Sequence, residues 1–151
     1  MDMGLGKKNA LVMSSSRGLG LGIAEALADE GVNVLLTGRS EDKLKENVEK
    51  INNRGGGKAY YVRVDLNEPE SVVLIYAAVQ KFLGGADILV NNTGGPPPGK
   101  MVDVDIGALP GQLEAMVTRV VQITDKLLPH MREQKWGRII TIGSSGLIQP
   151  I

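Results

Sequence analysis

The sequence has no cysteine and few aromatic residues, and these absences narrow the classes of protein it can belong to. With no cysteine among 151 residues, the chain cannot form disulfides or thiolate metal sites. Aromatic residues make up only 3%, so a core has to be built from Val, Ile, Leu, Ala and Met. No apolar run is long enough to cross a bilayer, and none near the N-terminus resembles a signal peptide. Together these absences favour a cytoplasmic protein.

The chain also lacks net charge and a second histidine. Lysine plus arginine equals aspartate plus glutamate, 17 each, so we expect neither a nucleic acid nor a membrane as a partner. No cluster of histidine and acidic residues has the spacing of metal ligands, so we expect no metal. The single histidine, His130, lies on an expected helix, where it is a helix-end residue rather than the base of a triad with Ser144 or Ser145.

Short apolar runs alternate with helical segments along the whole sequence. The expected strands are residues 9–13, 32–37, 59–64, 87–91 and 137–142. The expected helices are residues 19–30, 40–53, 65–82 and 110–134. This alternation predicts right-handed βαβ crossovers and therefore an α/β fold with a doubly wound parallel sheet in three layers, α/β/α. The length suits one domain and is too short for two ordinary ones, so we expect a single domain over residues 1–151.

A glycine-containing turn follows the first expected strand. Gly18 and Gly20 would let the backbone approach a pyrophosphate, and the next helix would present its unpaired N–H groups to that anion. The common G-x-G-x-x-G pattern is not matched, because Ile23 stands at the third position. A tight turn packed closely on a strand would use the same glycines, so phosphate binding is a hypothesis that needs further support.

Two arginines supply that support and favour NADP(H) over NAD. A site for NAD commonly places a carboxylate at the end of the second strand, whereas residues 36–40 contain no acid and include Arg39. A guanidinium can bind a 2′-phosphate through two charge-assisted hydrogen bonds, and Arg17 in the glycine turn could reach the same phosphate. Either arginine alone is also compatible with an ordinary surface charge.

Four motifs, in order, resemble those of the short-chain dehydrogenases/reductases, especially the 3-oxoacyl-carrier-protein reductases. Residues 16–20 resemble the second part of the family's T-G-x-x-x-G-x-G turn, and Asn91-Asn92-Thr93-Gly94 resembles its N-N-A-G motif. Asp65-Leu66 is similar to the pair that meets the adenine, and residues 137–144 resemble the strand that ends in the catalytic serine. The resemblance implies a Rossmann fold, a catalytic Ser144 and a cofactor site. That site would comprise Ser14, Ser16, Arg17, Gly18, Leu19, Gly20, Arg39, Asp65, Leu66, Asn91, Asn92, Thr93 and Gly94.

The chain departs from this family at several positions. Ser14 replaces the first glycine of the turn, preceded by Met13 where threonine is usual, and a Cβ at position 14 could crowd the turn. Met116 stands where the family has an asparagine that supports a water in the proton relay. The family's Tyr-x-x-x-Lys would follow Ile151, so we expect a C-terminally incomplete chain, truncated after the fifth strand, that binds cofactor weakly and turns over nothing.

Several other residues are expected to pack rather than react. These are Tyr60, Tyr61, Tyr76 and Trp136. The apolar stripe of the long helix exceeds what one buried face needs, and it predicts a homodimer or homotetramer. The stripe comprises Leu113, Met116, Val117, Val120, Val121, Ile123, Thr124, Leu127 and Leu128.

The resemblance implies NADP(H)-dependent interconversion of a ketone and a secondary alcohol, with a small carbonyl or alcohol substrate that could be a 3-oxoacyl thioester. A non-catalytic NADP(H)-binding or regulatory protein is the main alternative, favoured by Met116 and Ser14. A methyltransferase that binds S-adenosylmethionine on the same type of sheet is disfavoured, because Arg39 stands where an acid would bind the ribose hydroxyls.

Overall fold

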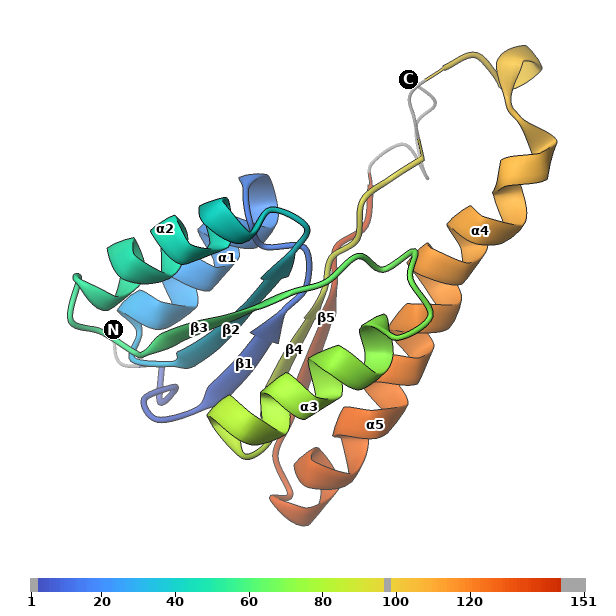
Figure 1. Ribbon diagram of the computed structural model, residues 1–151. Coiled ribbons are helices and arrows are strands. Elements are labelled where there is room, and N and C mark those ends of the chain that lie inside the picture. Colours follow the sequence, from blue (N-terminus) through green and yellow to red (C-terminus); the bar gives the residue numbers. More distant parts are fainter. Residues whose placement is uncertain (1–2, 97–98, 145–151) are drawn as a thin grey trace.

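Five parallel strands form one sheet in the computed structural model, which describes residues 3–96 and 99–144. The order across the sheet is β3-β2-β1-β4-β5, and every neighbouring pair is parallel (Figure 1). The strands are β1 (Asn9–Val12), β2 (Asn33–Gly38), β3 (Ala59–Arg63), β4 (Ile88–Asn91) and β5 (Arg138–Thr141). The helices are α1 (Gly18–Asp29), α2 (Glu41–Asn52), α3 (Ser71–Leu83), α4 (Leu109–Leu113) and α5 (Arg119–Glu133). The predicted doubly wound sheet is confirmed.

Helices cover both faces of this sheet, as the three-layer prediction requires. Successive residues of a strand point to opposite faces, so Ala10 and Val12 pack in a cluster with residues of α1 and α2. Leu11 and Met13 pack in a second cluster with residues of α3 and α5. Figure 1 shows α1 and α2 together on one side and α3 and α5 together on the other. The apolar runs of β1, β2 and β4 are therefore strands buried on both faces, whereas β5, at the edge of the sheet, is exposed.

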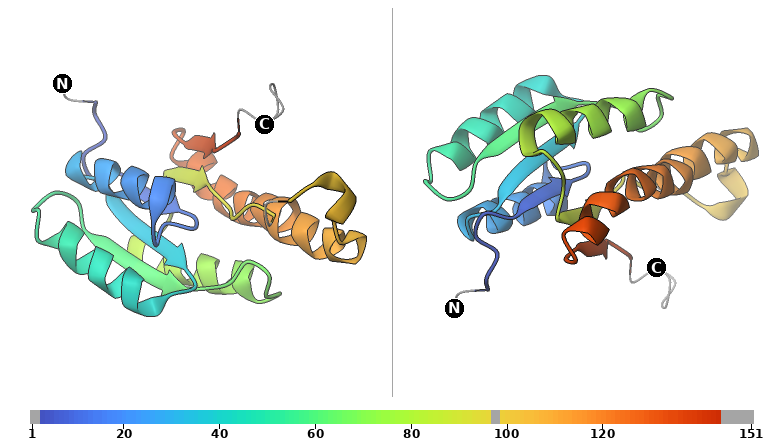
Figure 2. Two further views of the ribbon diagram at one scale, coloured as in Figure 1. Left: turned by 90° about the horizontal axis from the view of Figure 1, so that it is seen from above. Right: turned by 90° about the horizontal axis from the view of Figure 1, so that it is seen from below.

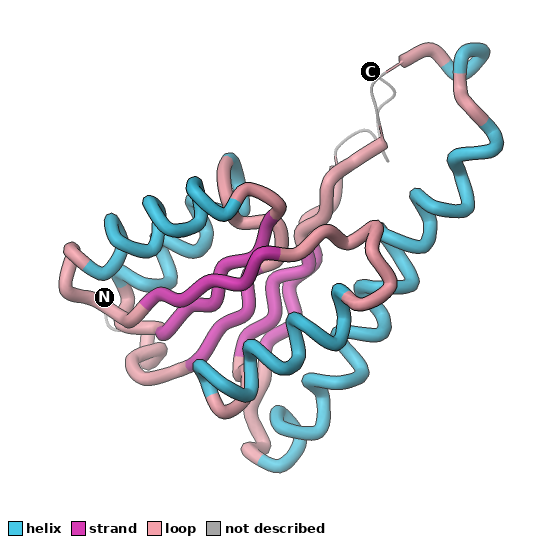
Figure 3. The backbone as a smooth tube through the Cα atoms, in the orientation of Figure 1, coloured by secondary structure: helices cyan, strands magenta, loops and turns pink. Residues whose placement is uncertain are grey.

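The chain reverses its direction of growth across the sheet between β1 and β4. From β1 it proceeds to β2 and β3, and then crosses back to add β4 and β5 on the other side of β1. The loops that leave the carboxyl ends of the strands gather at one edge of the sheet (Figure 3). In open α/β sheets, ligands bind in the crevice that such a reversal opens at this edge.

The third helix begins later than the sequence predicts. It starts at Ser71 rather than near residue 65, because Asp65 Oδ1 accepts hydrogen bonds from the backbone N–H of Asn67 at 3.0 Å and from its Nδ2 at 2.7 Å. Such a side-chain turn competes with helix formation. Pro69 further disfavours a helical backbone at the residue before it. Residues 65–70 therefore form a turn at the edge of the sheet.

The long helical segment contains a π-helical stretch that the sequence does not predict. Residues Glu114–Thr118 form it between α4 and α5, and the α4 end projects beyond the carboxyl ends of the strands (Figures 1 and 2). Glu114 and Arg119 are five residues apart and form an ion pair of 2.7 Å across this stretch. The wider π turn brings residues at that spacing together.

His130 and Trp136 lie at the opposite edge of the sheet, where the strands begin. His130 is in the last turn of α5 and its Nε2 lies 3.2 Å from Asp87 Oδ1, while Asp87 Oδ2 accepts from the backbone N–H of Asn9 at 2.9 Å. Trp136 packs against the cluster on the α1 and α2 side. The helix-end role of His130 and the packing role of Trp136 are therefore confirmed.

Two of the three tyrosines, Tyr60 and Tyr61, make the packing contacts predicted for them, whereas Tyr76 is 37% exposed and the packing prediction for it is wrong. The ring of Tyr60 stacks on Phe82 with centroids 5.2 Å apart, and Tyr61 packs against the cluster on the α1 and α2 side. Tyr76 lies on α3 beneath the ammonium group of Lys126, 5.4 Å from the ring centroid.

Candidate cofactor site

A cleft of about 410 Å³ opens at the carboxyl edge of the sheet, where the chain reverses direction. Ten of the predicted cofactor-binding residues line it: Ser14, Ser16, Arg17, Gly18, Arg39, Asp65, Leu66, Asn92, Thr93 and Gly94. They come from the loops after β1, β2, β3 and β4, which are far apart in sequence. The parallel sheet brings them together because every strand ends at the same edge.

The floor of the cleft is the β1–α1 turn, and β2 holds this turn by hydrogen bonds. Ser15 is fully buried. Its hydroxyl donates to the Val12 carbonyl at 2.7 Å and accepts from the Thr37 N–H at 3.0 Å. Ser14 has φ +48°, a left-handed conformation that costs a residue with a Cβ about 1 kcal/mol. Its N–H donates to Thr37 Oγ1 at 2.9 Å, which stabilises this conformation. The turn therefore accommodates Ser14 where the related family has glycine.

Gly20 allows β4 to approach the turn closely. A Cβ at this position would lie 2.5 Å from the Ser14 carbonyl oxygen and 2.8 Å from Asn92 Nδ2. Asn92 Nδ2 lies 3.2 Å from each of the carbonyl oxygens of Met13 and Ser14, to which it donates. Asn92 thus fixes the turn from the β4 side, and only glycine leaves room for it.

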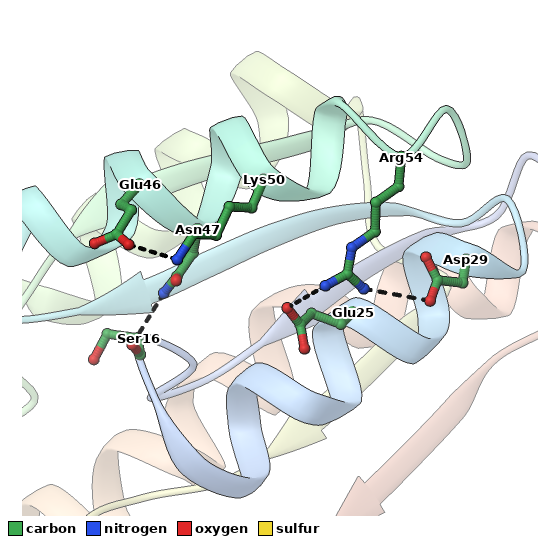
Figure 4. Close-up of polar contacts among 7 residues, drawn as sticks. All are labelled: Ser16, Glu25, Asp29, Glu46, Asn47, Lys50 and Arg54. Carbon is green, nitrogen blue, oxygen red and sulfur yellow. Dashed lines mark hydrogen bonds and ion pairs between the residues drawn. The ribbon is translucent and has the colours of Figure 1, made fainter.

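Asn47 of α2 fixes the same turn from the side of the α1 and α2 layer. Its Nδ2 donates to the Ser16 carbonyl at 3.0 Å, and the residue is only 8% exposed (Figure 4). Near the other end of α2, Arg54 pairs with Glu25 at 2.8 Å and Asp29 at 3.5 Å on α1. Both contacts hold α2 against the first βα unit.

Two arginine side chains face the cleft without a protein partner. Within residues 3–96 and 99–144, the guanidinium groups of Arg17 and Arg39 make no hydrogen bond or ion pair. Arg17 lies in the glycine turn and Arg39 follows the last residue of β2. No carboxylate occupies the end of β2, so this part of the cleft suits an anion.

Four predicted site residues do not line the cleft. Leu19 is 71% exposed and Gly20 lies behind the turn, where it contacts Asn92. Asn91 is buried at the end of β4, and its Nδ2 donates to Thr141 Oγ1 of β5 at 3.4 Å. Ser144 lies in the exposed segment after β5. Ser145, the other serine considered for catalysis, lies outside the described residues, as do residues 97, 98 and 149–151.

Several further residues that line the cleft were not predicted from the sequence, namely Thr37, Gly38, Val64, Asn67, Gly95, Gln112 and Ala115. Most of them adjoin residues that were predicted, so their position at the end of a parallel strand could have indicated them. Gln112 and Ala115 had no such signal, because they come from the long helical segment. Met116 lines the cleft beside them, so the position of the family's asparagine faces the site but carries a thioether.

Other kinds of site find no support in the part of the chain that the structure describes. Over these residues, no three histidine and acidic side chains lie close enough to share a metal ion. Likewise, none of the helices within them has the length and hydropathy needed to cross a membrane.

Known proteins are similar to this chain over nearly its whole length. The sequence profile of the short chain dehydrogenase family matches residues 8–150. The 3-oxoacyl-(acyl-carrier-protein) reductase FabG of Aquifex aeolicus is 35% identical over 144 residues, covering 95% of this chain and 58% of that protein. The D-beta-hydroxybutyrate dehydrogenase of Cupriavidus necator is 33% identical over 146 residues, covering 95% of this chain and 56% of that protein. The chain thus spans a little over half the length of these curated relatives.

Solved structures give the same result. The L-sorbose reductase from Gluconobacter frateurii, complexed with NADPH and L-sorbose, matches with a TM-score of 0.92 at 35% identity, covering 100% of this chain and 57% of that chain. The 3-oxoacyl (acyl-carrier-protein) reductase from Agrobacterium tumefaciens C58, with NADP bound, matches with a TM-score of 0.88 at 31% identity, covering 97% of this chain and 56% of that chain. The sheet order, the turn after β1 and the match over residues 8–150 together place the chain in the short-chain dehydrogenase family.

Proposed function

We propose that this chain is the cofactor-binding part of an NADP(H)-dependent oxidoreductase that interconverts a ketone and a secondary alcohol. The observation that carries the proposal is the pair of arginines, Arg17 and Arg39, whose guanidinium groups flank the cleft with no protein partner among the described residues. Relatives with these activities support it, because the L-sorbose reductase binds NADPH and the Agrobacterium reductase binds NADP.

The residues of the cleft fit a dinucleotide that carries a 2′-phosphate. Gly20 keeps the turn narrow, Gly18 has φ +59°, and the turn leads directly into the N-terminus of α1. Backbone N–H groups at such a helix start bind phosphate, and the helix dipole favours the negative charge. Ser16, Arg17 and Gly18 would thus hold the pyrophosphate side.

The remaining residues of the cleft would hold the rest of the cofactor. Arg39, Asp65 and Leu66 would hold the adenosine and its 2′-phosphate, and Thr93 and Gly94 would face the ribose. When bound, the cofactor supplies the hydride, and the protein supplies orientation and the proton.

Ser144 is the one residue of this chain that we assign to the substrate. It would donate a hydrogen bond to the carbonyl oxygen and so stabilise the negative charge that develops there during reduction. The family's tyrosine and lysine have no counterpart at the cleft among the described residues, so the 151-residue chain by itself should bind cofactor without turnover. The substrate class we favour is a small ketone, which includes a 3-oxoacyl thioester.

A second candidate function, a non-catalytic NADP(H)-binding or regulatory protein, has one observation in its favour. Met116 lines the cleft at the position where the family's asparagine supports a water, and a thioether is a poor partner for water. This candidate shares the cofactor site with the enzyme but requires no substrate.

Calorimetric titration of the purified chain with NADPH, NADH and S-adenosylmethionine tests the proposal. We expect NADPH to bind about tenfold more tightly than NADH, since about 1.4 kcal/mol corresponds to a factor of ten, and we expect no heat from S-adenosylmethionine. Equal affinity for NADPH and NADH would refute the role of the two arginines. Loss of NADPH absorbance with L-sorbose or an acetoacetyl thioester, by a chain of verified mass, would refute the expected lack of turnover.

We also propose that the protein forms a homodimer or homotetramer through the outer face of the long helical segment. Leu113, Val117 and Val121 follow one another every four residues on this face and are 60%, 52% and 61% exposed. Such a continuous apolar stripe loses its contact with water when a second copy covers it. A monomer in sedimentation at micromolar concentration, or a Val117→Glu variant that still associates, would refute this proposal.

A further inference from the structure

We propose that Arg63 is a third determinant of NADP(H) preference, which positions Arg39 and adds positive charge beside the 2′-phosphate. This inference rests on the proposed function and deepens it. Arg17 lies in the glycine turn and Arg39 follows β2, whereas Arg63 lies at the end of β3.

Arg63 is tied to the Arg39 backbone by a direct hydrogen bond. It is the last residue of β3 and pairs in register with Gly38, the last residue of β2. From there its Nε donates to the Arg39 carbonyl at 3.1 Å. The bond crosses between two strand ends, so it fixes the backbone from which the Arg39 side chain extends toward the cleft.

The same two arginines line a second hollow that continues from the cleft. This hollow is about 250 Å³ in volume and shares Arg39, Val64 and Asp65 with the cleft. The side of the cleft that holds Arg39 therefore adjoins the hollow lined by Arg63. Asp65, Glu68 and Glu70 also line the hollow, and the guanidinium groups of Arg39 and Arg63 are the two cationic groups in its lining that can bind an anion.

Arg63 keeps the rest of its guanidinium group available for a ligand. Asp65, Glu68 and Glu70 line the same hollow, and Glu41, at the start of α2, is a further acid near Arg63. The Oε1 of Glu41 is engaged by Lys45 Nζ at 3.2 Å and by the Tyr61 hydroxyl at 3.2 Å. The lysine, the tyrosine and the nearby Arg63 hold the pKa of Glu41 below its usual value, so this carboxylate stays charged and paired. Within the described ranges, Arg63 itself forms no ion pair.

These contacts give Arg63 two separable effects on the cofactor. The hydrogen bond from its Nε orders the Arg39 segment, and this reduces the entropy lost when Arg39 binds a phosphate. Its positive charge attracts the 2′-phosphate, which carries about two negative charges at neutral pH. Both effects act at the 2′-phosphate, which NADP(H) carries and NAD(H) replaces with a hydroxyl.

The test compares Arg63→Gln and Arg63→Lys with a matched control, Arg132→Gln, in the full 151-residue chain. Arg132 is an exposed arginine in the last turn of α5, at the opposite edge of the sheet. Calorimetry gives the dissociation constants of NADPH and NADH, and of adenosine 2′,5′-bisphosphate and adenosine 5′-monophosphate. Thermal unfolding followed by circular dichroism checks that each variant folds.

We expect R63Q to weaken NADPH and adenosine 2′,5′-bisphosphate by about fivefold, in line with a solvent-accessible charged contact. NADH and adenosine 5′-monophosphate should change by less than about twofold, within the scatter of surface substitutions. R63K should recover part of the loss because it keeps the charge, and R132Q should behave as the wild type.

Each of four results would overturn the inference. Unchanged NADPH affinity in R63Q would remove any role for Arg63, and equal losses for NADPH and NADH would make its role structural. If the wild-type chain binds neither dinucleotide, the proposed function fails and the inference fails with it. If the wild type prefers NADPH and R63Q prefers it equally, only the inference fails.

Discussion

Replacing Gly20 with alanine tests the central packing feature of the site. The new Cβ would lie 2.5 Å from the Ser14 carbonyl oxygen, 2.8 Å from Asn92 Nδ2 and 2.9 Å from Ser15 Cα. All three distances are below normal contact, and two of the three atoms belong to the backbone. The turn after β1 and the side chain of Asn92 would therefore have to move apart.

The magnitude follows from three opposing contributions. Overpacking of a tight site costs about 1–3 kcal/mol, and weakening the two hydrogen bonds of Asn92 costs about 0.5–1.5 kcal/mol each. Alanine recovers about 1 kcal/mol because it favours the helix more than glycine does. Taken at the middle of each range, these contributions predict that G20A lowers the free energy of unfolding by about 3 kcal/mol.

Gly22 offers a matched control in the same helix. A Cβ at Gly22 would meet nothing within 4 Å, so G22A should raise the free energy of unfolding by about 0.5–1 kcal/mol. Urea denaturation followed by circular dichroism measures both variants, and calorimetry measures NADPH binding. G20A should bind NADPH at least about tenfold more weakly, a change of about 1.4 kcal/mol, whereas G22A should bind as the wild type does. If G20A proves as stable as G22A and binds NADPH equally well, the narrow turn does not govern the site.

Three further predictions concern contacts at and around the sheet. Asn47→Ala removes the hydrogen bond to the turn and should cost about 1 kcal/mol of stability while weakening NADPH several-fold, as measured by urea denaturation and calorimetry. The pKa of Glu41 should lie below its ordinary 4.5, mainly because of Lys45. The stability it contributes is therefore present above the unfolded pKa and is lost as the pH falls through the folded pKa. An NMR titration in which the pKa of Glu41 rises toward the ordinary value in Lys45→Ala would confirm the cause, and an unchanged pKa would contradict it. Asp87→Ala should cost about 2 kcal/mol, because it leaves the partly buried backbone N–H of Asn9 without its acceptor; a thermal midpoint equal to that of the wild type would contradict it.

The local patterns in the sequence were sufficient for the fold. Short apolar runs such as those of β1 and β2, alternating with helical segments, are typical of a parallel sheet covered by helices on both faces. The glycine turn and the arginines that follow two of the strands can then be placed close together, because parallel strands all end at the same edge of the sheet. Most of the residues that line the cleft could therefore be predicted from their order along the chain.

The start of α3 and the π-helical stretch could not be predicted in this way. The turn at Asp65 and Pro69 competes with a helix that apolar periodicity extends too far. Glu114–Thr118 has the periodicity of an ordinary helix, and the ion pair between Glu114 and Arg119 becomes visible only once the backbone is known. Both differences arise where side-chain contacts decide between backbone conformations of similar energy.

The sequence by itself determined the alternation of strands and helices, the turn that can receive a phosphate and the arginines beside it, because each is written in residues close together along the chain. The tertiary structure decided which side chains hold that turn in place. Asn47 reaches Ser16 from 31 residues away, and Asn92 reaches Ser14 from 78 residues away. Contacts at such separations depend on strand register and on how the helices pack against the sheet, which no local pattern encodes.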